Sequence, residues 1–162
     1  MENLLIRPAR KEDAVEILRL IKELAEFERA PHEVTNTVEQ ILKDGFGTNP
    51  VFKAGVAESD GKIVGLYLWY IRYSTWKGKG LYLEDIIVNE NYRNRGIGAH
   101  LFEACVADAK AMDANFMIWQ VLDWNVDAIR FYERYGPDFD GEWINVKLSK
   151  QQITDFKFHP RD

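Results

Sequence analysis

Apolar and polar residues along this chain follow two periods, and each period indicates one kind of element. Alternation at every second position predicts strands, whereas apolar residues spaced three and four apart predict amphipathic helices. Strands are expected over residues 4–6, 51–57, 62–73, 81–88, 116–122 and 142–148, with the second and third antiparallel and joined by the turn Ser59-Asp60-Gly61. Helices are expected from Asp13, after Thr37 as the capping residue, from the glycine-containing residues 93–98, around residues 128–132 and over 151–156. The main elements therefore run β-α-α-β-β-β-α-β-α-β, which predicts an α/β fold.

The first helix carries its apolar residues on one face and ends in a run of acids. Its apolar positions, from Ala14 to Ala25, keep helical spacing. Carboxylates then gather at its end, in Glu23, Glu26 and Glu28. This cluster is either a solvated helix end or the carboxylate-lined mouth of a site for a cation, and the pattern alone fits both.

Residues 93–98, Arg-Asn-Arg-Gly-Ile-Gly, separate the strand at 81–88 from the next helix. Glycines let a ligand approach the backbone, free N–H groups at a helix start bind anions, and two arginines add donors for phosphate. A Walker A loop is excluded because Ala99-His100 follows Gly98 where Lys-Ser/Thr is needed. The hexapeptide alone fits a phosphate cradle or a glycine-softened turn with solvated arginines about equally.

Bulk composition limits the class of protein. The 162 residues are 46% hydrophobic and 29% charged, without repeats or low-complexity tracts, which predicts a single domain over residues 1–162. The net charge of −5 argues against nucleic-acid binding and suits a cationic substrate. We expect no membrane span, no signal peptide and a cytoplasmic location. The single cysteine, Cys105, is expected to be a buried structural thiol, and the three histidines lack metal-ligand spacing.

The strand, the loop and several longer sequence segments together resemble the GCN5-related N-acetyltransferases. Arg-x-x-Gly-x-Gly after a strand resembles the acetyl-CoA loop of that family, and the predicted element order is the one expected for its fold. The segments at 6–9, 17–25, 44–47, 73–78, 81–85 and 121–125 are similar to sequences of its spermidine/spermine and thialysine acetyltransferase branch. The resemblance implies a mixed, mostly antiparallel central sheet flanked by helices.

The resemblance also implies which residues hold acetyl-CoA, the co-substrate, with no metal involved. Pantetheine would pair with the backbone of Ile86, Ile87 and Val88, and the pyrophosphate would lie on the glycine loop. The complete set implied is Ile86, Ile87, Val88, Arg93, Asn94, Arg95, Gly96, Ile97, Gly98, Ala99, Asn125, Val126, Asp127, Ala128 and Tyr135.

Two residues are predicted to carry the chemistry. Tyr132, seven residues after Asn125, aligns with the family's general acid, which protonates the departing thiolate; alternatively it is an aromatic packing residue. Glu84 is the candidate that binds the substrate ammonium and passes its proton out, directly or through water. Alternation places Glu84 and Asp85 on opposite faces unless a bulge intervenes, so Glu84 is expected to face the substrate and Asp85 to be structural. The alternative pairs both carboxylates with nearby arginines or backbone N–H groups.

The resemblance gives substrate contacts at Phe27, Glu28, Glu84, Ile118, Trp119 and Gln120. Ser74 stands where the polyamine enzymes have an aspartate, and a missing carboxylate weakens binding of a long polycation. A short diamine or a lysine-like amino acid is therefore favoured over spermine. Acetylation of a protein amino group and a non-catalytic acetyl-CoA or polyamine sensor are the alternatives. Because the family members are homodimers, a homodimer is also implied.

Overall fold

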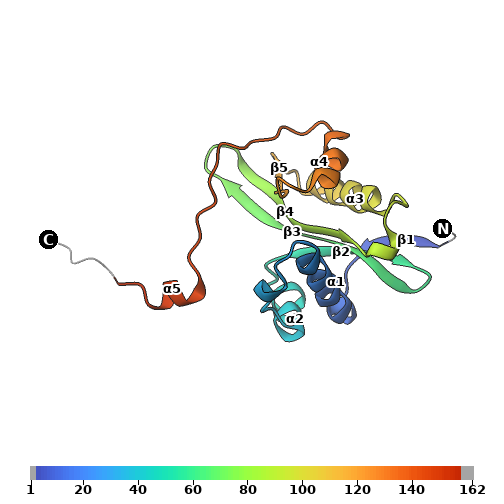
Figure 1. The fold of residues 1–162 in the computed structure, drawn as a ribbon, viewed down its shortest axis with the longest axis horizontal. Helices are drawn as coiled ribbons and strands as arrows, with labels where there is room; N and C mark the ends of the chain where they lie inside the picture. The colour runs from blue at the N-terminus through green and yellow to red at the C-terminus, as the bar shows by residue number, and fades with distance from the viewer. Residues whose placement is uncertain (1–2, 158–162) are drawn as a thin grey trace. The chain divides into compact units, whose positions relative to one another are not determined.

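The computed structural model describes residues 3–157, and the chain divides into two compact units after Gln120 (Figure 1). Each unit is described by itself. No helix among the described residues is long and apolar enough to cross a membrane.

A five-stranded mixed sheet forms the centre of the first unit. Its strands lie in chain order: β1 (Leu4–Pro8), β2 (Lys53–Ser59), β3 (Lys62–Ser74), β4 (Gly78–Val88) and β5 (Met117–Ile118). The first four are antiparallel and β5 runs parallel to β4. The predicted hairpin between β2 and β3 is present: Asp60 and Gly61 both have positive φ, as a tight two-residue turn requires. The predicted mixed, mostly antiparallel sheet is confirmed.

Helices α1 (Ala14–Phe27) and α2 (Val38–Phe46) cover one face of the sheet, and α3 (Ile97–Ala111) covers the other (Figure 1). Thr37 caps α2 as predicted, because its side chain accepts a hydrogen bond from the Gln40 N–H at 3.1 Å. The core beneath α1 and α2 consists of Ala14, Ile17, Leu18, Leu20, Ile41, Val56, Leu66 and Ile87.

The α3 face has a polar anchor within an otherwise apolar layer. The Tyr67 hydroxyl and the Trp69 indole N–H both donate to Asp108 of α3, at 3.0 and 2.9 Å. Cys105 is buried one turn away, as predicted, and burial beside Asp108 raises the pKa of its thiol to about 12. A thiol held neutral in this way is a packing group.

The short β5 leaves much of β4 open. A strand was expected over 116–122, but β5 pairs with β4 only at Leu81 and Tyr82. Among the described residues of the first unit, no strand pairs with that edge of β4 from Leu83 to Val88. An open edge presents unpaired backbone N–H and C=O groups to a ligand.

The described part of the second unit holds two helices, α4 (Val126–Glu133) and α5 (Lys150–Thr154). Asn125 caps α4 by accepting a hydrogen bond from the Ala128 N–H at 3.2 Å, and Ser149 and Gln152 form a capping box at α5. The strand predicted over 142–148 is wrong: the described part of this unit contains no strand. Alternation is present there, but a strand also needs a hydrogen-bonding neighbour.

Candidate active site

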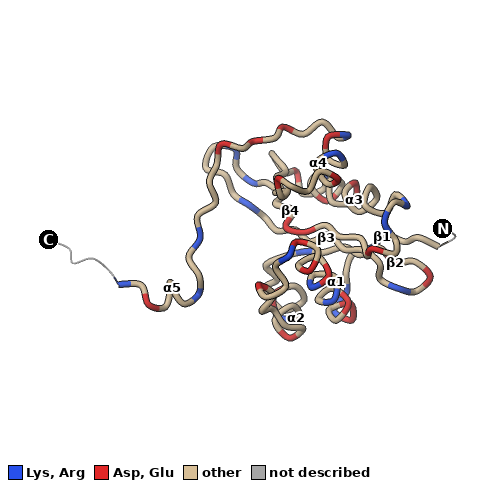
Figure 2. Tube along the Cα trace, in the orientation of Figure 1, with Lys and Arg blue, Asp and Glu red and all other residues tan. Residues whose placement is uncertain are grey.

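The glycine loop has the geometry of an anion cradle. Gly96 directly precedes α3 with φ of 81°, and a side chain built on it would meet no atom within 4 Å, so the approach to the helix start is open. The first N–H groups of α3 have no partner within the helix and point toward this opening. Figure 2 shows basic positions in the loop that leads into α3. The Arg95 guanidinium lies over the Tyr92 ring, 5.3 Å from its centroid.

Arg93 joins the open edge of β4 to the end of α1. Its Nε donates to the Val88 carbonyl at 3.0 Å, and its guanidinium lies 5.0 Å from the centroid of the Phe27 ring. Residues predicted separately for acetyl-CoA (Val88, Arg93) and for the amine (Phe27) are therefore neighbours in the structure. The open edge of β4 leads directly to the glycine loop.

A β-bulge lies at Glu84. Leu68 of β3 pairs with Asp85 and the next residue, Trp69, pairs with Leu83, so Glu84 is the extra residue. The bulge resets the alternation, and Asp85 falls on the same face as Ile87, which packs in the core beneath α1. Alternation along the sequence placed Glu84 and Asp85 on opposite faces unless a bulge intervened, and the structure has that bulge. Figure 2 shows the acidic stretch within β4.

The carboxylates and phenols around the bulge influence one another. Burial, followed by the charges of Glu84 and Glu28, raises the pKa of Asp85 to about 7. Burial and the neighbouring Glu84 raise the pKa of Tyr70 to about 12. The Tyr70 and Tyr82 rings stack with centroids 5.0 Å apart. The end of α1 and the bulge thus form one negatively charged region, which suits an ammonium group.

The three substrate residues predicted around β5 separate in the structure. Ile118 pairs with Tyr82 and is 37% exposed, next to the bulge along β4. Trp119 packs against Phe102 of α3, with ring centroids 5.3 Å apart. Gln120 is exposed. Of these three, the pairing places Ile118 on the face that carries Tyr82.

The remaining predicted residues belong to the second unit. Asn125 caps α4, while Val126 and Asp127 are exposed in its first turn. Tyr132 is buried and its ring meets Phe131 edge-on at 5.1 Å, whereas Tyr135 is 40% exposed.

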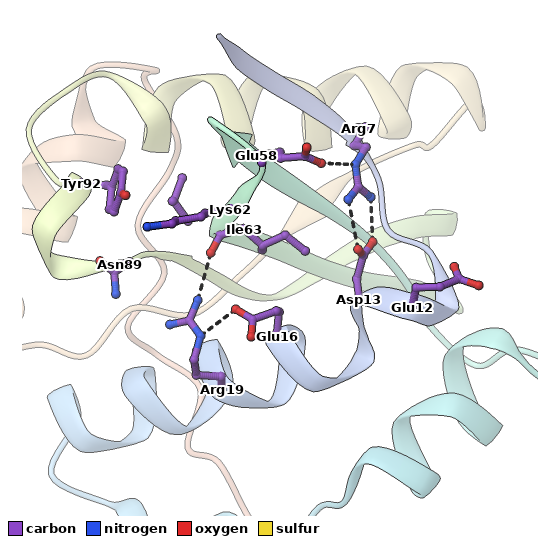
Figure 3. A pocket seen from close by; sticks show the side chains of 12 residues that line it. Arg7, Glu12, Asp13, Glu16, Arg19, Glu58, Lys62, Ile63, Asn89 and Tyr92 are labelled. Carbon is purple, nitrogen blue, oxygen red and sulfur yellow. Dashed lines mark hydrogen bonds and ion pairs between the residues drawn. The ribbon is translucent and has the colours of Figure 1, made fainter.

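A charged hollow of about 600 Å³ lies elsewhere on the first unit (Figure 3). Both arginines that line it are paired: Arg7 binds Asp13 at 2.7 and 3.0 Å and Glu58 at 2.9 Å, and Arg19 binds Glu16 at 2.8 Å. None of the predicted site residues lines this hollow. Its ion pairs tie β1 to the start of α1 and to β2, which is a structural role.

Comparisons with known proteins show which family this chain belongs to. Residues 14–136 match the model of the acetyltransferase (GNAT) family. Mouse thialysine N-epsilon-acetyltransferase is 41% identical over 93% of this chain and 95% of its own. Human spermidine/spermine N(1)-acetyltransferase-like protein 1 is 36% identical over 96% of this chain but 24% of its own.

A solved aminoglycoside N-acetyltransferase in complex with CoA is similar in fold, with a TM-score of 0.73 and 19% identity over 90% of this chain and 95% of that one. The chain therefore belongs to the acetyltransferase (GNAT) family, and it is an N-acetyltransferase.

The arrangement around the bulge was not predicted from the sequence: alternation without a bulge placed Asp85 on the face opposite Glu84, and Tyr70 was not singled out. The face that each of these residues occupies depends on which residue of β3 pairs with which residue of β4. The letters Leu-Glu-Asp-Ile contain no signal for that register.

Proposed function

We propose that this enzyme transfers the acetyl group of acetyl-CoA to the terminal primary amine of a lysine-like amino acid or a short diamine, in a ternary complex and without a covalent enzyme intermediate. The observation that carries the proposal is the bulge at Glu84. It places carboxylates beside an open strand edge that leads into an anion-binding loop.

The first unit supplies what acetyl-CoA needs. No strand in the described part of the chain pairs with the outer edge of β4 at Ile86–Val88, so its backbone groups, other than the Val88 carbonyl that accepts from Arg93, offer hydrogen bonds to pantetheine in the manner of an added strand. The N–H groups at the start of α3 and the side chain of Arg95 would hold the pyrophosphate. Asn125–Ala128 and Tyr135 are proposed to complete these contacts from the second unit.

Glu84 and Glu28 are proposed to bind the ammonium, with Phe27 and Ile118 packing against its alkyl chain. A primary ammonium has a pKa near ~10.4, so it must lose a proton before its nitrogen can attack the thioester. Glu84 takes part in removing that proton. The attack breaks the carbon–sulfur bond, and Tyr132 donates a proton to the departing sulfur. A phenol with a pKa near ~10 can protonate a thiolate whose parent thiol has a pKa near ~8.5 if the two are in contact.

The length of the amine is inferred from Ser74 and from the relatives. The Ser74 hydroxyl accepts hydrogen bonds from the backbone N–H groups of Trp76 and Lys77, both at 3.2 Å, so it closes the turn after β3 and provides no countercharge. The mouse relative at 41% identity is named for thialysine, a lysine-like amino acid. Both observations favour one terminal ammonium over a long polycation.

The first experiment is a steady-state CoA-release assay with acetyl-CoA and spermidine, spermine, putrescine, thialysine, lysine and a basic peptide. We expect saturable turnover with kcat/KM for thialysine above that for spermine. A preference for spermine would overturn the interpretation of Ser74. Turnover of the basic peptide and of none of the small amines would indicate that the acceptor is a protein amino group.

The enzyme is also proposed to be a homodimer, as the resemblance implies. Apolar side chains in the second unit support this proposal, because Trp143, Ile144 and Val146 are 77%, 88% and 91% exposed in the single chain.

A further inference from the structure

Asp85 is a half-buried carboxylate that the fold does not use. Among the described residues, its side chain takes part in no hydrogen bond and no ion pair, whereas in the same unit the Asp13 carboxylate binds three donor groups and the Asp108 carboxylate binds two. Removing a carboxylate from water without a partner costs free energy, and such groups persist where they serve a function. A purely structural role therefore leaves Asp85 unexplained.

The pairing of β3 with β4 shows which way Asp85 faces. Asp85 pairs with Leu68 and Tyr82 pairs with Tyr70, two residues further along β3, so these four share one face of the sheet. The bulged Glu84 lies close enough to Tyr70 to raise the pKa of its phenol. The bulge thus directs two adjacent carboxylates to the face on which α1 ends.

The charged and titratable groups around Asp85 come from three elements. Glu84 of β4 and Glu28 at the end of α1 act on its carboxyl, and Asp85 in turn contributes to the raised pKa of Tyr82. Tyr70 and Arg72 of β3 interact with Glu84 and Tyr82. Arg72 lies over the Tyr82 ring, 5.7 Å from its centroid, and Arg93 lies over Phe27, so each cation faces an aromatic ring. The two acidic neighbours and burial together raise the pKa of Asp85 to about 7.

We propose that Asp85 accepts the proton of the substrate ammonium, while the exposed carboxylates of Glu84 and Glu28 hold the cation and pass the proton to solvent. This inference rests on the proposed function. One N–H bond of the ammonium breaks, its proton moves to the Asp85 carboxylate, and the nitrogen keeps the electron pair that attacks the thioester carbon. The carbon–sulfur bond then breaks and the sulfur is protonated by the general acid. The second proton of the attacking nitrogen passes through solvent to the phenolate of the general acid and restores it, so the one proton released overall is the one that Asp85 accepted.

The proposal predicts different pH profiles for two adjacent variants. In the wild type, kcat/KM should fall about tenfold per pH unit below pH 7, because Asp85 must be ionised to accept a proton. Asp85→Asn should lower kcat by about 10²–10⁴-fold, the usual contribution of a general base. It should also abolish the acid limb of the profile, which is the fall of kcat/KM below pH 7. Glu84→Gln should chiefly raise KM and move the limb to lower pH, since the Glu84 charge is one cause of the raised pKa of Asp85. Loss of the limb in Glu84→Gln with its retention in Asp85→Asn would overturn the proposal.

Stability provides a readout that a structural aspartate would not share. The pKa of Asp85 is higher in the folded than in the unfolded chain, so its stabilising effect is present at low pH and lost as pH rises through about 7. Asp85→Asn should therefore have a Tm at pH 8 equal to or above that of the wild type. Asp60→Asn in the β2–β3 turn, where φ is 49° and asparagine is well tolerated, is the matched control and should leave kcat and the pH limb unchanged.

Direct titration separates this proposal from the choice of acceptor. Carboxyl ¹³C NMR of the free wild type, assigned with Asp85→Asn, should show a carboxyl titrating near pH 7 that moves lower in Glu84→Gln. An Asp85 that titrates below about pH 5 would overturn the proposal whichever amine the enzyme accepts. A small-amine panel without turnover, with this titration intact, would instead overturn the proposed substrate class.

Discussion

Tyr132 and Tyr135 lie one turn apart at the end of α4, yet their surroundings differ. The two rings contact Phe131, with centroids at 5.1 and 5.6 Å, but Tyr132 is 5% exposed and Tyr135 is 40% exposed. A buried tyrosine can serve as packing or as a positioned acid, and the two roles differ in whether the hydroxyl is needed. Removing that single oxygen separates them.

Tyr132→Phe should lower kcat by about 10²–10⁴-fold, the range of a general acid, because the ring is kept and only the proton donor is lost. The Kd for acetyl-CoA, measured by titration calorimetry, should change less than threefold. Tyr73→Phe is the matched control, since Tyr73 is 74% exposed on β3. A Tyr132→Phe enzyme with wild-type kcat would show that Tyr132 only packs.

Among the elements, the glycine loop before α3 has a backbone conformation that limits substitution. Gly96 has φ of 81° in open space, so alanine there is opposed by backbone strain and not by a clash. A single side chain in the left-handed region costs about 1 kcal/mol, and relief of that strain would tilt the N–H groups at the start of α3.

Gly96→Ala should therefore weaken acetyl-CoA binding about tenfold or more in a fluorescence or calorimetric titration. Gly61→Ala provides the control, because Gly61 has nearly the same φ, 76°, and equally open space at the β2–β3 turn. Both variants should lose similar stability in urea, but only Gly96→Ala should lose affinity. Equal affinities in the two variants would remove the loop from the acetyl-CoA site.

Elements that depend on local sequence were the predictable part of this protein. Thr37 at the start of α2, the Asp60-Gly61 turn and the glycine loop all follow from short-range chemistry, and the structure has the capped helix, the turn and the open loop where they were expected. The position of Asp85 could not be predicted, because it depends on the register between β3 and β4. The strand expected over 142–148 failed for a related reason: alternation does not provide a pairing partner.

In the molecule as a whole, the exposed apolar segment 143–146 is the feature that a single chain explains least. Covering Trp143, Ile144 and Val146 would remove a large apolar surface from water. Such burial stabilises an association by roughly 25 cal/mol per Å². A second copy of the chain is the occupant consistent with the proposed homodimer. The alternation that predicted a strand there also suits pairing with a strand edge of that copy.

Replacing Trp143, Ile144 and Val146 together by serine should convert a dimer into a monomer, measured by light scattering after size-exclusion chromatography across a hundredfold range of concentration. Val15→Ser with Val51→Ser is the control, because these residues are 61% and 67% exposed in the first unit, and the dimer should persist. Thermal melting would establish that the triple variant is folded. A wild-type chain that is monomeric throughout that range would overturn the homodimer, whereas a triple variant that stays dimeric would place the interface on another surface.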